Sequence, residues 1–453
     1  MDTRILVAAA LCAAACGGTP PADKTGALDV ELTQAPPDVS CLQLTVTGAT
    51  RSVTRSFDLA SGQSTASLSL TGLPTGSVLL SANAWSQPCA SVTGAAGWIA
   101  VAQKVTVPGS ASIVLQRNGQ ATVSVNFQDD QRKVTTLVDT AANISALGIA
   151  ADNLGNLYVT GNSAIRKVVI STGAISVLAG APGVTGAIDA TGAAARFSQP
   201  EAIACDTGCA NLYVVDSNNC TIRKVVVATA AVTTVAGAAG NCTAADGTPG
   251  AFSSYTGGLS FDPAGNLWVA DSGSVRKVVL PTGSAVAGTT STPVGSLTVS
   301  GGPVDGIGAA ARFGFTVGGT FFDGLGNLFV ADFGNGAVRK VVLSTLAVTT
   351  IAGSIGTPQD GIGTQAHFTS LWGMTGDNQG NLFVTDYGNY TVRKVVLANA
   401  AVVTIAGSGS IGTADGLGAA ASFNSPFFMT IDSAGVLWVP ESGNGRIRSI
   451  AMP

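Results

Sequence analysis

Residues 132–453 alternate short runs of apolar and β-branched residues with turns rich in Gly, Asp and Asn. One stretch shows the pattern clearly, with such runs at residues 373–377, 381–386, 392–397 and 402–406. Runs of this length, rich in Val and Thr, predict β-strands. Between the first two runs, Asp377 opens and Gly380 closes a segment typical of a tight hairpin. The pattern therefore predicts an all-β region built from units of four strands.

The second strand of this unit recurs along the chain at a spacing of about 55 residues, which is typical of propeller blades. Its copies read GNLYVTG at Gly155, ANLYVVDS at Ala210, GNLWVADS at Gly265, GNLFVADF at Gly326, GNLFVTDY at Gly380 and GVLWVPES at Gly435. After each of the first five copies comes an Arg-Lys run, such as VRKVV at Val338–Val342, and then an outer run, such as VTTIAG at Val348–Gly353. Six copies predict six blades.

The sixth copy stops after the run at 446–451 and lacks an outer strand. An unattached run, KVTTLVD at Lys133–Asp139, precedes the first leading strand. We expect Val134–Val138 to pair with Ile447–Ala451 and to close the ring, because closure removes exposed sheet edges.

The unit resembles the NHL repeat family, whose pattern has a leading strand that ends in Asp, followed by GNLYVAD, IRKV and TVAG strands. The resemblance implies a six-bladed β-propeller over residues 132–453. The expected fold is also similar to that of propeller enzymes such as amidating lyases, gluconolactonases and virginiamycin B lyase. These enzymes use several His or acidic residues around a metal or substrate in the channel. This chain has a single histidine, His367, in a position where sister repeats carry Arg or Ser.

Residues 28–130 form a different segment, with alternating strands predicted at 42–47, 66–70, 78–82 and 122–127. The stretch GLPTGSVLLSANAW at Gly72–Trp85 resembles part of a small β-sandwich of the immunoglobulin or prealbumin type. The fold class expected for the chain is thus all-β, a six-bladed β-propeller preceded by a small β-sandwich domain.

The first residues carry Arg4 and then a small-apolar run at 5–15, which has the length of a secretory signal and is too short to span a bilayer. The run ends in Ala-Ala-Ala-Cys with Cys16, which resembles the lipobox of bacterial lipoproteins. The resemblance implies removal of residues 1–15, a lipid on Cys16, a tether at 16–27 and, from Gly17, an exported protein anchored to the bacterial outer membrane or cell surface. A plain cleavable signal with Cys16 as a spare thiol is the alternative.

The charge content excludes one class of partner. Charged residues make up 11% of the chain and the net charge is −4, whereas nucleic-acid binding needs clustered Lys and Arg. No later stretch of the sequence reads as a membrane span. We expect membrane contact through the lipid anchor only.

Setting Cys12 and Cys16 aside leaves an even number of cysteines, which favours disulfides in an exported protein. Their positions in the predicted strands favour the pairs Cys41–Cys89, Cys205–Cys209 and Cys220–Cys242. A metal site is the competing interpretation of Cys205 and Cys209.

Candidate catalytic residues are few. His367 is interpreted as structural, and no cofactor, metal site or catalytic residue is predicted. Carboxylates at the end of the second strands recur with arginines, and we expect them to pair between blades or with nearby backbone; the pairs involve Asp216, Asp271, Asp332 and Asp386 with Arg223, Arg276, Arg339 and Arg393, and Glu441 takes the place in blade 6. The DGxG segments at Asp305, Asp360 and Asp415, with looser copies at Asp189 and Asp246, offer one carboxylate each, so a turn role is favoured over calcium binding.

Function is expected where the repeats diverge. The loops before the first strands and the turns before the Arg-Lys strands emerge on one face, and the candidate ligand-binding residues there are Trp372, Phe427, Tyr387, Tyr390, Phe333 and Glu201. Packing between blades is the alternative role for these aromatic residues. The sequence favours a lipid-anchored binding or scaffold protein that recognises a protein, peptide or glycan; the alternatives are a propeller lyase or lactonase with its site in the channel and a passive structural lipoprotein.

Overall fold

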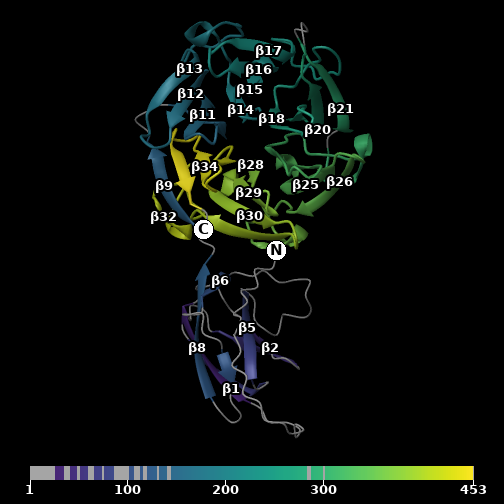
Figure 1. Ribbon diagram of the computed structural model, residues 1–453. Helices are drawn as coiled ribbons and strands as arrows, with labels where there is room; N and C mark the ends of the chain where they lie inside the picture. Colours follow the sequence, from purple (N-terminus) through teal and green to yellow (C-terminus); the bar gives the residue numbers. More distant parts are fainter. Residues whose placement is uncertain are drawn as a thin grey trace. The chain divides into compact units, whose positions relative to one another are not determined.

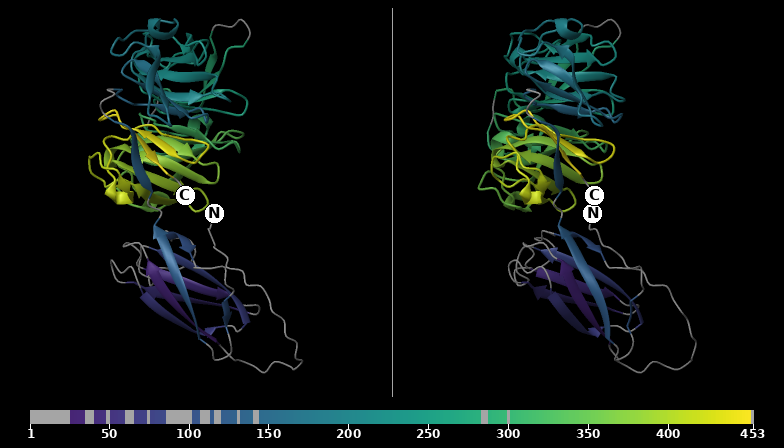
Figure 2. Two further views of the ribbon diagram at one scale, coloured as in Figure 1. Left: turned by 60° about the vertical axis from the view of Figure 1, so that its left-hand side comes forward. Right: turned by 90° about the vertical axis from the view of Figure 1, so that its left-hand side faces the viewer.

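The computed structural model describes residues 26–34, 41–47, 51–59, 66–73, 76–85, 102–106, 113–115, 120–129, 132–139, 144–282, 287–298 and 301–451. The chain divides into two compact units, Met1–Asp130 and Gln131–Pro453. Both are built from strands, as Figures 1 and 2 show.

The first unit contains two four-stranded sheets. One has the order β4 (Ala66–Leu73), β1 (Gly26–Gln34), β8 (Gln120–Asp129), β6 (Ala102–Thr106); the other has the order β3 (Ser52–Asp58), β2 (Cys41–Thr47), β5 (Gly76–Trp85), β7 (Ile113–Leu115). In β2 the buried side chains of Leu42, Leu44 and Val46 alternate with more exposed ones, so one face of the strand lies in a core. The sandwich type stays a prediction.

The second unit is a ring of six sheets, which Figure 1 shows as blades around a common axis. Blade 1 contains β10 (Ile149–Ala151), β11 (Asn156–Gly161), β12 (Ala164–Val169) and β13 (Ile175–Gly180). Blade 2 contains β14 (Pro200–Cys205), β15 (Asn211–Asp216), β16 (Thr221–Val226) and β17 (Val232–Gly237), and blade 3 contains β18 (Thr256–Phe261), β19 (Leu267–Asp271), β20 (Ser274–Val279) and β21 (Thr289–Gly295).

Blades 4 to 6 each have a fifth, two-residue strand on the outer edge. Blade 4 contains β23 (Thr320–Phe322), β24 (Asn327–Asp332), β25 (Ala337–Val342), β26 (Ala347–Ala352) and the short β22 (Gly306–Ile307). Blade 5 contains β28 (Leu371–Gly376), β29 (Asn381–Asp386), β30 (Thr391–Val396), β31 (Ala401–Ala406) and β27 (Gly361–Ile362), and blade 6 contains β33 (Thr430–Ile431), β34 (Leu437–Pro440), β35 (Ile447–Ile450), β9 (Lys133–Val138) and β32 (Gly416–Leu417).

Short 3-10 turns occupy two kinds of position. They lie in the loops that lead into blades, at Gly192–Ala194, Gly308–Ala310, Gly363–Gln365 and Gly418–Ala420, and in the turns before third strands, at Ser217–Asn219, Phe333–Asn335 and Tyr387–Asn389.

The sequence predicts four strands per blade, and the fifth strands are a departure from it. The DGxG segments of blades 4 to 6, interpreted from sequence as turns, place their Gly and the next residue alongside the outer strand, as Gly306↔Val348 and Ile307↔Ala347 show. The leading strand of blade 5 also begins earlier than expected, at Leu371.

The second strands explain how the blades hold together. Nearly all of their residues are buried, as in β15 and β24, because a neighbouring blade covers each face. The seam between blades 4 and 5 is typical: Phe329 of blade 4 and Leu382 of blade 5 belong to one apolar cluster. Continuous burial of this kind selects the unbroken apolar runs of the repeat anchors.

The ring closes as the sequence predicts. Strand β9 pairs antiparallel with β35, with Val134 opposite Ile450 and Val138 opposite Ile447. Both valines are buried. The N-terminal strand of the second unit thus completes the C-terminal blade and leaves no open sheet edge at that point.

Candidate binding face

Glycines bring the first strands of neighbouring blades into backbone contact around the axis. A Cβ added to Gly148 would collide with the carbonyl oxygen of Glu201, and one added to Gly373 would collide with that of Phe427. Gly319 N donates to the Trp372 carbonyl at 2.6 Å, a hydrogen bond between blades 4 and 5. The inner wall of the ring is therefore drawn together until backbone touches backbone.

Apolar side chains fill what remains of the channel. Ile149, Ile203, Leu259, Met374 and Met429 line a cavity of about 50 Å³ at the axis. Pockets for small-molecule ligands measure roughly 300 to 1,000 Å³. The lining contains no titratable side chain. This cavity is thus too small for a typical small-molecule ligand.

Gly148 and Gly373 occupy the same position of the repeat, and the residue before that position lies where the first strand begins. In blades 5 and 6 this residue is Trp372 and Phe427, whose rings stack with centroids 4.7 Å apart and planes 24° apart. Phe333 meets Trp372 edge-on at 4.9 Å, and Tyr387 meets Phe427 edge-on at 5.8 Å. Four of the six residues predicted from sequence therefore form one cluster across blades 4, 5 and 6.

A second aromatic pair lies on the same face. Tyr255 and Phe315 stand in the loops before the first strands of blades 3 and 4, with ring centroids 4.9 Å apart. They are 52% and 54% exposed. Phe315 lies beside the turn that carries Phe333, because Gly334 N donates to the Thr316 carbonyl at 3.0 Å. Sequence reasoning missed this pair because neither residue aligns with the position of Trp372.

We call this surface the aromatic face; it consists of Tyr255, Phe315, Phe333, Trp372, Tyr387 and Phe427. It extends over four consecutive blades, 3 to 6. Four of its side chains are half-buried, so part of each ring is exposed while the rest packs on the propeller; these are Phe333, Trp372, Tyr387 and Phe427. The buried Trp372 Nε1 donor has no hydrogen-bond partner among the described residues.

Tyr390 lies elsewhere. It packs against the core between blades 5 and 6, with Val392 and Phe423, and its backbone is left-handed at φ 54°. The equivalent position in blade 2 is Cys220, which is bonded to Cys242 in the loop after the outer strand. This position therefore points toward the rim of the ring rather than toward Trp372.

Glu201 occupies the Trp372 position in blade 2, where it continues the face with polar groups. Gln199 Nε2 donates to Glu201 Oε1 at 2.5 Å, and Asn218 Nδ2 donates to Gln199 Oε1 at 3.2 Å. Burial raises the pKa of the Glu201 carboxyl, and the Gln199 hydrogen bond opposes that rise. The face thus has an aromatic sector over blades 3 to 6 and a polar sector over blade 2.

The repeated arginines form buried ion-pair modules in blades 2 to 6. Each arginine binds the carboxylate that ends the second strand and the Asp of the DGxG-type loop, with N–O distances from 2.6 to 3.6 Å; the sets are Arg223 with Asp216 and Asp189, Arg276 with Asp271 and Asp246, Arg339 with Asp332 and Asp305, Arg393 with Asp386 and Asp360, and Arg448 with Glu441 and Asp415. A Phe ring lies 4.6 to 5.3 Å from each guanidinium.

These pairs form within a blade, whereas the sequence suggested pairing between blades. The reason is that Arg339 lies on the strand adjacent to the one Asp332 ends, so both side chains project on one side of the same sheet. The loop Asp also accepts from a Thr of the outer strand, as Thr350 N and Oγ1 do with Asp305. The DGxG carboxylates are thus ligands of arginine and threonine.

His367 also has a structural place. Its carbonyl accepts from Arg393 Nη1 at 2.6 Å, as the Arg196 carbonyl does from Arg223 and the Ser422 carbonyl from Arg448. It is absent from the lining of the axial cavity. Among the residues that the structure describes, no group of His, Cys, Asp or Glu is arranged to hold a metal ion.

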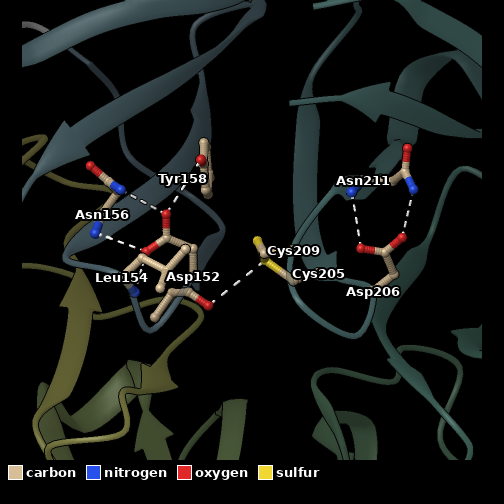
Figure 3. The surroundings of a disulfide bond; sticks show 9 residues. Asp152, Leu154, Asn156, Tyr158, Cys205, Asp206, Cys209 and Asn211 are labelled. Atoms are coloured by element: carbon tan, nitrogen blue, oxygen red, sulfur yellow. Dashed lines mark hydrogen bonds between the residues drawn. A yellow bond between two sulfur atoms is a disulfide. The ribbon is translucent and has the colours of Figure 1, made fainter. Parts of the chain in front are cut away.

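Both disulfides expected in blade 2 are present, Cys205–Cys209 and Cys220–Cys242. Figure 3 shows the first beside the hairpins of blades 1 and 2. In blade 1, Asp152 accepts from Asn156, four residues on, whereas in blade 2 Asp206 accepts from Asn211, five residues on. The disulfide spans this longer hairpin. Cys41 is also disulfide-bonded, and Cys89 lies outside the described residues, as does Cys16.

Comparison with known proteins gives a fold and no family. No family model matches the chain. An alignment over 133 residues, which covers 27% of the chain, shows 29% identity to Protein SUPPRESSOR OF QUENCHING 1, chloroplastic, of Arabidopsis thaliana. The chain spans only 12% of that protein.

Three solved structures from Bacteroides thetaiotaomicron VPI-5482 resemble it over most of both chains. A structural genomics protein of unknown function has a TM-score of 0.55 at 15% identity, and an auxiliary nutrient binding protein has 0.52 at 14%, each over 90% of both chains. A putative phosphatase has 0.50 at 12% over 91% of both. The second unit of the chain is a six-bladed β-propeller. Identities this low show the fold alone.

Proposed function

We propose that this protein is a lipid-anchored binding protein of the bacterial cell envelope, which holds a protein, peptide or glycan on the aromatic face of an NHL-type propeller. The observation that carries the proposal is the gathering of aromatic side chains at one end of the ring: a cluster of four rings in blades 4 to 6 and a pair of rings in the loops of blades 3 and 4. Large rings on a packed base supply contact area at low entropic cost, which makes them typical anchors of binding surfaces.

The small volume of the axial cavity favours the aromatic face over the channel as the binding site. A lyase or lactonase of the kind considered from sequence requires a channel with polar or metal-binding groups, and here Ile149, Ile203 and Met374 occupy that place. A resemblance in fold to an auxiliary nutrient binding protein is consistent with a binding role.

The envelope location is supported by the cysteines and the N-terminal motif. Disulfides such as Cys220–Cys242 are typical of oxidising compartments. No helix among the described residues is long and apolar enough to cross a membrane. The anchor proposed is the lipid on Cys16.

The test is retention of a ligand from envelope extract, or of glycans on an array, by the immobilised full chain and three variants. Trp372→Ala with Tyr387→Ala removes central rings and should weaken binding by at least about 2 kcal/mol, roughly thirtyfold. Because these rings also pack on the core, a second variant, Tyr255→Ser with Phe315→Ser, alters the exposed pair and leaves the base intact.

The matched control is Leu154→Ser with Leu325→Ser. These side chains are 80% and 85% exposed at hairpins on the opposite end of the ring, so their loss should leave binding unchanged. If both aromatic variants fold and retain full affinity, the aromatic face is not the binding site.

A further inference from the structure

Blade 1 keeps the buried arginine of the repeat but lacks the carboxylates that accompany it elsewhere. Arg166, 5% exposed, occupies the position of Arg223 and Arg339. Within the described residues its donors reach only backbone: Nη1 donates to the Gly161 carbonyl at 2.7 Å and lies 3.5 Å from the Ile144 carbonyl.

The sequence accounts for both missing acids. Gly161 stands where the other second strands end in Asp or Glu. The loop that carries the second Asp in blades 2 to 6 is replaced by residues 139–148, whose only acid is Asp139. That carboxylate pairs with Arg446 at 2.8 Å.

The outer strand of blade 1 also lacks the threonine that binds the loop Asp in the other blades. In blades 2 to 6 a Thr of the outer strand, such as Thr234, donates its N and Oγ1 to the loop Asp. The equivalent residue in β13 is Val177, opposite Arg166 in the sheet, and it is 46% exposed. No described strand pairs with the outer edge of β13, whereas β22, β27 and β32 lie along that edge in blades 4 to 6.

A guanidinium that is buried without a carboxylate is unfavourable, because its desolvation is not offset by an ion pair. Burial also lowers the pKa of Arg166. The arrangement is complete in blades 4 to 6, where the arginine pairs with two carboxylates and a two-residue strand lies along the outer strand. Compared with those blades, blade 1 lacks a carboxylate on Arg166 Nη2 and two or three residues of extended chain along β13.

We propose that blade 1 is a docking site for an extended acidic segment of another protein, which adds a short strand to the edge of β13 and places an Asp or Glu carboxylate on Arg166. Main-chain hydrogen bonds to the strand edge supply affinity, and the charge-assisted bond to the guanidinium selects the acidic residue. The chain's own loops show the chemistry of the occupant, an Asp followed by Gly and an apolar residue, as at Asp305 and Asp415. This site is separate from the aromatic face and stands independently of it.

The probe is a fluorescently labelled peptide with the sequence of residues 411–423, IGTADGLGAAASF, titrated with the purified full chain by fluorescence polarisation. A control peptide carries Asn in place of its Asp. The protein variants are Arg166→Gln, which removes the cation, and Val177→Thr, which restores the hydroxyl that other blades use. Melting temperatures confirm that each variant folds.

Saturable binding of the Asp peptide should weaken at least about tenfold with the Asn peptide or with Arg166→Gln, and strengthen with Val177→Thr. Three results overturn the proposal: no saturable binding at millimolar peptide, equal binding of the Asp and Asn peptides, or unchanged binding by Arg166→Gln. A fourth contradicting result is full competition by acetate at the same concentration as the peptide, because the site would then bind a small anion without any contribution from strand pairing.

Discussion

The contrast between Arg339 and Arg166 tests whether carboxylates stabilise the blades. Both arginines are buried at the same position in the third strand, but Arg339 pairs with Asp332 at 2.8 Å and Asp305 at 3.1 Å, whereas among the described residues Arg166 donates only to backbone. The perturbation is Arg→Met at each position, which keeps an unbranched apolar stem of similar reach. The two sites differ in one further respect, because the Phe313 ring lies 4.9 Å from the Arg339 guanidinium, so the comparison measures the acids together with that ring.

The magnitude follows from burial. Asp332 is fully buried, so Arg339→Met leaves an uncompensated charge that costs about 3 to 5 kcal/mol. Asp305 is 50% exposed, and its loss adds little because solvent screens the pair. Arg166→Met loses hydrogen bonds to backbone and relieves an unpaired buried charge, so a net cost of at most about 1.5 kcal/mol is expected.

Differential scanning calorimetry measures the difference. For a unit of this size 1 kcal/mol corresponds to roughly 1.5 °C, so Arg339→Met should lower the melting temperature of the propeller by about 4 to 7 °C and Arg166→Met by at most about 2 °C. Equal losses in the two variants would refute the reasoning, because the arginine would then stabilise through its packing on backbone and neighbouring rings rather than through its carboxylates.

Two further predictions concern the ends of the chain. Deleting Val134–Asp139 removes β9, exposes the edge of β35 and should lower the melting temperature markedly; a truncated ring that melts like the parent would show that the strand does not close it. Cys16→Ser should abolish acylation and move the exported protein from the membrane fraction to the soluble fraction, and a variant that stays with the membrane would contradict the lipid anchor.

The blade architecture could be predicted because the sequence repeats its physical requirements. Each second strand is buried on both sides and so reads as an apolar run. In every blade except blade 2, the first hairpin contains an Asp that accepts from the backbone two and four residues on, as Asp152 does. The closing strand was predictable for the same reason: one outer strand was missing at 451 and one was unassigned at 133.

The binding face was predictable only where residues share an alignment position. Trp372 and Phe427 follow one another at equivalent points of adjacent blades, so their contact could be anticipated. Tyr255 and Phe315 do not align, and their contact depends on loop paths that the repeat pattern does not specify. Tyr390 packs against the cluster that contains Val392 and Phe423, a location that the repeat pattern does not specify.

The most direct test of the binding face compares two photo-cross-linking positions in blade 4. Benzoylphenylalanine is introduced in place of Phe315 or Leu325, which are 54% and 85% exposed at opposite ends of the same pair of strands. The proteins are displayed in their native envelope and irradiated. We expect a specific cross-linked product from position 315 and none from position 325. Cross-links from position 325 alone would place the ligand on the opposite end of the ring and contradict the proposed function.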